Sequence, residues 1–163
     1  MLPPPRANCF DASALVKVYA AEPGSAIVRD YFLHRSPTKY TTPFCFYEAL
    51  NILKGKWMFR SQLSEAEYQA AAAKLITWFS VTTRYSPDIE LTSREVLEQV
   101  REIARAHSLD FSDAFQIVSV KHGRFSRLAN ENQTVLVTAD FRLAEAARRE
   151  GLRAWDVLNE VEP

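Results

Sequence analysis

Acidic side chains follow two apolar stretches of the chain, where carboxylates are candidates for metal-ion chemistry. Asp11 follows Ala7–Phe10, and Asp140 comes soon after Thr134–Thr138. Both stretches have the length and composition of buried parallel strands, and ligands bind beyond the carboxyl ends of such strands. The pattern predicts that both carboxylates face one crevice. Each Asp also precedes a predicted helix, and helix capping is the alternative role.

Further acids lie in predicted helices. Glu48 is the one acid in the apolar helix that Pro43 opens, and a carboxylate covered on several sides needs a partner. Asn51 lies one turn later, which favours a polar stripe, although a helix edge facing water would also explain Glu48. Asp110 and Asp113 lie at the start of another helix. We expect Asp110 to cap it and Asp113 to point inward as a functional acid.

Carboxylates that converge in one crevice repel each other. Two unit charges about 4 Å apart cost about 4 kcal/mol at an effective dielectric constant of about 20. Either the pKa values of the acids rise, or a divalent cation neutralises them. Oxygen ligands favour Mg²⁺ or Mn²⁺ over zinc, and such an ion can activate water and stabilise charge on a phosphodiester.

Composition excludes several classes of protein. The 163 residues carry 20 basic and 20 acidic side chains, so nucleic-acid binding requires a local patch rather than a generally basic surface. The four glycines fit neither a Walker loop nor a dinucleotide fingerprint. Cys9 and Cys45 are expected to be free, buried thiols. With no signal sequence and no apolar run near the roughly 20 residues of a membrane span, we expect a cytoplasmic protein without membrane contact.

Strand and helix patterns alternate along the chain. The predicted strands are 7–10, 39–42, 81–85, 134–138 and 153–157. The predicted helices are 13–19, 25–34, 43–59, 64–79 and 93–106, then one capped by Asp110 and one ended by Gly151. This alternation predicts an α/β fold, a three-layer α/β/α sandwich around a five-stranded parallel sheet. No linker is evident, so residues 1–163 are expected to form a single domain.

The segment Asp11–Tyr19, followed by Glu22–Ser25, resembles the opening of PIN-domain nucleases, and especially of the VapC toxins of bacterial toxin–antitoxin pairs. The resemblance continues in order through Glu48, Asp113–Ala114 and Val137–Asp140. It implies a PIN-like fold, Mg²⁺ or Mn²⁺ as cofactor, and cleavage of single-stranded RNA. The acidic site that it implies consists of Asp11, Glu48, Asp113 and Asp140, with Ser13 and Thr138 as polar supports. It also implies a homodimer and an antitoxin partner whose tail enters the active-site groove.

Three functions are compatible with this resemblance. The leading hypothesis is a metal-dependent endoribonuclease that is the toxin of a type II pair. The alternatives are a housekeeping RNA-processing PIN nuclease and a non-cleaving PIN-like module that binds metal or RNA. A haloacid-dehalogenase phosphatase is disfavoured because it needs a second Asp where this chain has Ser13.

Basic residues close to the acids are candidates for RNA phosphate contacts, namely Lys17, Lys54 and Arg142. A denser basic cluster follows the Asp113 helix, where cations also have an ordinary role at a helix C-terminus. It consists of Lys121, His122, Arg124 and Arg127. Tyr47 and Phe141 could stack on bases, although packing or chance exposure is the favoured interpretation.

Overall fold

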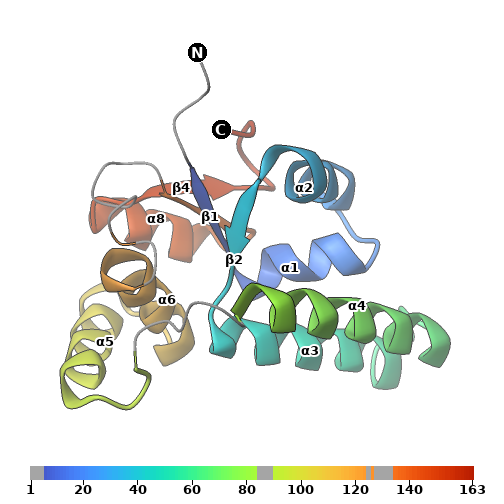
Figure 1. Ribbon diagram of the computed structural model, residues 1–163, viewed down its shortest axis with the longest axis horizontal. Helices are drawn as coiled ribbons and strands as arrows, with labels where there is room; N and C mark the ends of the chain where they lie inside the picture. The colour runs from blue at the N-terminus through green and yellow to red at the C-terminus, as the bar shows by residue number, and fades with distance from the viewer. Residues whose placement is uncertain (1–5, 84–89, 124–125, 127–133) are drawn as a thin grey trace.

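Four parallel strands form one sheet in the computed structural model, which describes residues 6–83, 90–123, 126 and 134–163 (Figure 1). The strands are β1 (Ala7–Phe10), β2 (Thr38–Tyr40), β3 (Thr134–Thr138) and β4 (Arg153–Asp156), and their order in the sheet is β2-β1-β3-β4. The helices are α1 (Ala12–Tyr19), α2 (Ser25–Asp30), the π-helix η1 (Tyr31–Arg35), α3 (Pro43–Met58), α4 (Glu65–Thr83), α5 (Arg94–His107), α6 (Phe111–His122) and α8 (Phe141–Arg149).

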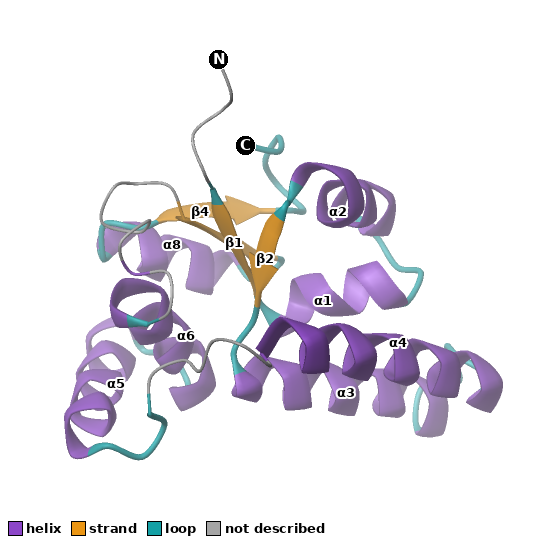
Figure 2. Cartoon of the chain, in the orientation of Figure 1, coloured by secondary structure: helices purple, strands orange, loops and turns teal. Residues whose placement is uncertain are grey.

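Helices cover both faces of the sheet, so the predicted three-layer arrangement is confirmed (Figure 2). The strands alternate between the two cores, as successive side chains on a strand must. Phe10, Val135 and Val137 pack toward α1, α2, α3 and α4. Cys9 and Leu136 pack on the opposite face, toward α6 and α8. In the part of the chain that the structure describes, no helix is long and apolar enough to cross a bilayer.

The strand predicted at 81–85 is wrong, so the sheet has four strands among the described residues and not five. Residues 81–83 form the last turn of α4, whereas 84 and 85 lie outside the described residues. The β-branched run Val81-Thr82-Thr83 favours a strand locally. Helix α4 is already nucleated, and Ala71 and Leu75 pack it against the core. Extending such a helix orders only one residue for each hydrogen bond gained, so the helix continues through 81–83 despite the local preference for a strand.

The order of the strands creates a switch point between β1 and β3. From β1 the chain crosses to β2 on one side, and it later returns to β3 on the other side of β1. The segments that leave the carboxyl ends of β1 and β3 therefore diverge and open a crevice, which is where open α/β sheets bind ligands. Asp11 follows β1 directly, and Asp140 lies two residues beyond β3.

The predicted helix 25–34 divides into α2 and the π-helix η1. The wider π turn accompanies the burial of two consecutive aromatic residues, Tyr31 and Phe32. The Tyr31 hydroxyl donates a hydrogen bond of 2.8 Å to Asn8 Oδ1, and Asn8 Nδ2 donates one of 2.8 Å to Ser36 Oγ. These bonds satisfy the buried amide in the middle of β1.

A buried ion-pair triad joins α1 to α3. The ammonium groups of Lys17 and Lys56 lie 2.8 Å and 2.7 Å from the carboxylate oxygens of Glu22. Lys17 Nζ also donates a hydrogen bond of 2.8 Å to the Pro23 carbonyl. The prediction that Lys17 contacts RNA phosphates is therefore wrong, because its side chain is only 6% exposed and its ammonium is engaged.

We expect Glu22→Gln to lower the free energy of unfolding by about 3 kcal/mol, because it leaves two buried ammonium groups without a counter-charge. Burial alone would raise the Glu22 pKa, but hydrogen bonds and charge from Lys17 and Lys56 lower it below the ordinary 4.5. The advantage of the wild type is thus present above pH 4.5 and shrinks as the pH falls below it. Urea unfolding at several pH values measures this difference.

The control is Asp30→Asn, which breaks a half-exposed surface pair with Arg35. Such pairs contribute about 1 kcal/mol or less. Equal small losses for the Asp30 and Glu22 variants would show that the triad contributes little to stability.

Candidate metal centre

Asp11 is a buried carboxylate fixed at the carboxyl end of β1. Its backbone N–H donates to the Val137 carbonyl at 2.9 Å, which continues the pairing of β1 with β3. Its Oδ2 accepts hydrogen bonds of 2.6 Å from Ser13 Oγ and 2.8 Å from Thr138 Oγ1. These two hydroxyls hold Oδ2 in place, and the carboxylate does not act as a side-chain cap of α1.

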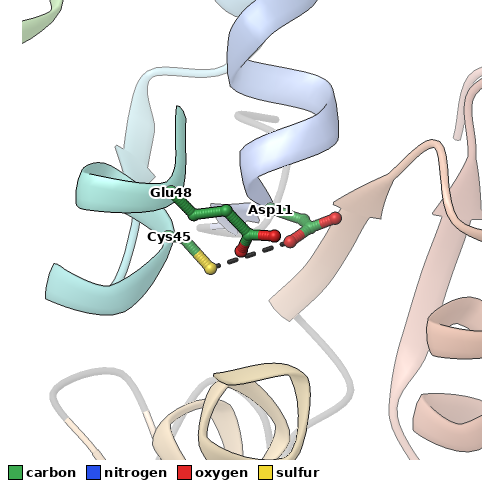
Figure 3. A group of neighbouring side chains, drawn as sticks. All are labelled: Asp11, Cys45 and Glu48. Carbon is green, nitrogen blue, oxygen red and sulfur yellow. Dashed lines mark hydrogen bonds between the residues drawn. The ribbon is translucent and has the colours of Figure 1, made fainter. Parts of the chain in front are cut away.

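Helix α3 brings a thiol and a second carboxylate to Asp11, as Figure 3 shows. Cys45 and Glu48 lie three residues apart and project from the same side of the helix. Ligand atoms of Asp11, Cys45 and Glu48 all lie within 4.8 Å of one another, and Cys45 Sγ donates to Asp11 Oδ1 at 3.7 Å. Cys45 is free and buried, as predicted, but its place beside the acids was missed.

Gln116 is another residue that sequence reasoning missed. It is fully buried on α6. In the amide orientation that satisfies both partners, its nitrogen donates to Asp11 Oδ1 at 3.1 Å, and its oxygen accepts from the Asp11 backbone N–H at 3.2 Å. The available signal was a single amide inside the apolar run Phe115–Val118. A buried polar side chain in such a run needs a polar partner.

Two of the acids cap helices. Asp110 Oδ1 accepts a hydrogen bond of 2.9 Å from the Asp113 backbone N–H, so its predicted role as the cap of α6 is confirmed. Asp140 Oδ1 accepts one of 2.8 Å from the Arg142 backbone N–H and a longer one from Leu143. The capping alternative thus applies to Asp140, while its charge still acts on the other acids of the crevice.

Asp113 is a carboxyl group with a strongly raised pKa. Its pKa rises from the ordinary 3.8 to about 8, first because the group is buried. Repulsion by neighbouring carboxylates adds to this rise, from Asp11, Asp110, Asp140 and Glu48. Burial raises the pKa of Glu48 as well, and Asp11, Asp110 and Asp140 add to that effect. The four predicted acids therefore share one electrostatic environment.

The donor set suits a hard divalent cation. Glu48 Oε2 is buried and has no hydrogen-bond partner among the described residues. No hydrogen bond from these residues therefore offsets the cost of removing this carboxylate oxygen from water. Burial, with the charge of Asp11, raises the pKa of the Cys45 thiol well above 9. Cys45 is thus a neutral donor to Asp11, and the anionic ligands that remain for an ion are oxygens.

The basic residues around this centre differ in exposure. Lys54 and Arg142 are exposed, as phosphate contacts must be. Lys121 instead pairs with Glu150 at 2.7 Å, close to the end of α6. Arg124 and Arg127 lie outside the described residues.

In the metal-free protein, Asp113→Asn should stabilise the fold at pH 8, with a gain that shrinks toward pH 5. Because the pKa of Asp113 is raised in the folded state, the folded protein holds this proton more tightly than the unfolded chain does. Wild-type stability therefore falls as the pH rises from about 4 toward 8, and the variant lacks this contribution. Urea unfolding in EDTA across this range measures it.

Asp110→Ala is the matched control, compared at pH 5, where Asp113 keeps its proton. Loss of a helix cap should lower the free energy of unfolding by about 1 kcal/mol. A destabilised Asp113→Asn protein at every pH would contradict the electrostatic account.

Comparison with known proteins connects this geometry to a family. The family model of the PIN domain matches residues 9–149. A solved structure with the same fold is PAE2754 from Pyrobaculum aerophilum, which is 22% identical and superposes with a TM-score of 0.55 over 91% of this chain and 90% of its own. The search of curated proteins found no match. The chain therefore belongs to the PIN domain family.

Proposed function

We propose that this protein is an Mg²⁺- or Mn²⁺-dependent endoribonuclease that cleaves single-stranded RNA and acts as the toxin of a type II toxin–antitoxin pair. PIN domains are generally metal-dependent nucleases, which supports phosphodiester hydrolysis. The observation that carries the proposal is the clustering of mutually repelling carboxylates at the switch point, where Glu48 Oε2 has no hydrogen-bond partner in the described part of the chain. Such a site is poorly stable by itself and suited to a cation.

Each acid has a proposed task set by its place. Asp11, held by Ser13 and Thr138, would be the fixed ligand, with Asp113 and Asp140 completing the set directly or through water. Glu48, on the opposing helix α3, would ligate the ion or orient the attacking water. The bound ion would activate that water and stabilise charge on the phosphate. Gln116 and Cys45 keep Asp11 in a single orientation.

The RNA would lie over the crevice, with Lys54 and Arg142 at its rim. Both side chains are exposed and lie on helices that carry or follow a site acid. Each phosphate contact adds affinity that falls as salt concentration rises. As a toxin, the protein would form a homodimer, and an antitoxin would silence it by placing a tail in the same crevice.

Purified protein should cut single-stranded RNA in Mn²⁺ or Mg²⁺ and stop when EDTA is added, because the site cannot neutralise its own charge. Gel analysis of end-labelled RNA measures the cleavage. The metal mechanism would be excluded by full activity in EDTA after contaminating nucleases are removed. Cleavage of single-stranded DNA at the same rate would instead refute the RNA preference.

The same assay compares the two acids at the start of α6. Asp113→Asn should lose nearly all cleavage, whereas Asp110→Ala should keep measurable cleavage because Asp110 serves as the cap. The opposite result would show that the third site acid has been assigned wrongly.

Expression of the protein in bacteria should arrest growth, and co-expression of the protein encoded by the adjacent gene should relieve the arrest. The Asp113→Asn protein is the control, since it should fold without blocking growth. Growth curves of induced cultures test this. RNA cleavage in vitro without growth arrest would favour a processing nuclease over a toxin.

A further inference from the structure

A groove runs along α3 directly beside the metal centre. It has a volume of about 490 Å³, within the range of about 300–1,000 Å³ that is usual for small-ligand sites. Tyr47, Glu48 and Asn51 line it from α3, Arg60 from the segment after that helix, and Ser112 from the start of α6. Because Glu48 belongs both to this groove and to the acid cluster, the two are continuous.

Tyr47 is an exposed but braced ring. Its side chain is 65% exposed. Phe46 holds it edge-to-face, with ring centroids 5.2 Å apart, and Phe46 in turn stacks on Phe79 at 4.1 Å. Since Phe46 is buried, it anchors the Tyr47 ring to the core. A ring fixed in this way offers a flat stacking surface with little loss of freedom on binding.

Polar side chains line the same groove as this ring. Asn51 is exposed one turn after Tyr47, and its amide can both donate to and accept from the edge of a base. Arg60 is exposed and adds a cation to a groove that Glu48 makes acidic at the metal centre. A single-stranded nucleic acid fits a groove that offers a metal centre, an aromatic ring with an amide, and a cation, because a phosphate lies on each side of every base along the strand.

We propose that this groove is a subsite for one nucleotide next to the scissile bond, with its base stacked on Tyr47 and its edge read by Asn51. Arg60 pairs with the phosphate farther from the metal centre. This inference rests on the proposed ribonuclease function and adds a source of nucleotide preference to it. Tyr47 is thus a binding residue, in contrast to the packing or chance exposure that the sequence analysis favours.

The experiment uses a labelled single-stranded RNA that the wild type cuts at one mapped bond. Tyr47→Ala should raise KM about tenfold and change kcat less, since stacking binds the substrate without taking part in the reaction. Tyr47→Phe should behave like the wild type because it keeps the ring. Phe59→Ala is the matched control, since Phe59 is 81% exposed just after the same helix and does not line the groove.

A second RNA series carries one abasic nucleotide at successive positions around the cut bond. At one position next to the cut bond, removing the base should raise the KM of the wild type by about the same factor as Tyr47→Ala does. In the Tyr47→Ala variant, removing that base should not raise KM further. Asn51→Ala should weaken nucleotide preference at that same position. Unchanged KM in Tyr47→Ala, or an undiminished abasic penalty in that variant, would overturn the subsite while leaving the nuclease intact. A wild type that cuts no RNA would refute both the nuclease function and the subsite.

Discussion

The hydrogen-bonded carboxylate of Asp11 is the interaction on which the candidate centre depends. It lies where β1 ends, and its partners Ser13 and Thr138 come from α1 and from the end of the neighbouring strand β3. The bonds form only because β1 and β3 are parallel neighbours with Phe10 opposite Val137. The register of one strand pair therefore sets the position of the first ligand, and the helices that leave both strands bring further acids to it.

Much of this arrangement was predictable because short-range sequence patterns determine it. Three short-range signals were available. They are a strand that ends at an Asp, an apolar helix that contains one acid, and two Asp residues three positions apart at a helix start. The cap at Asp110 followed from such a signal. The convergence of Asp11 and Asp140 followed from the rule that parallel strands present their carboxyl ends at one edge, and only that rule is non-local.

What could not be predicted depends on contacts between distant segments. Lys17 follows Asp11 closely in sequence, yet its side chain turns inward because Glu22 and the Pro23 carbonyl hold it. Gln116 is 105 residues away from Asp11 in the chain, and the sequence around it does not indicate which residue it contacts. The strand expected at 81–85 failed for a similar reason: packing against the core decided the state of that segment, against its β-branched composition.

The carboxylates of the centre are satisfied unequally, and this inequality bears on how the centre works. Asp11 has hydroxyl donors, so it is oriented before any cation arrives. Glu48 has a buried oxygen that lacks a hydrogen-bond partner among the residues that the structure describes, and the pKa of Asp113 is raised to about 8, so both are disfavoured as free anions. A cation bound at the proposed site would relieve this cost, and its binding would therefore couple to proton release from Asp113. Without a cation, these acids therefore lower the stability of the fold, as groups at functional sites commonly do.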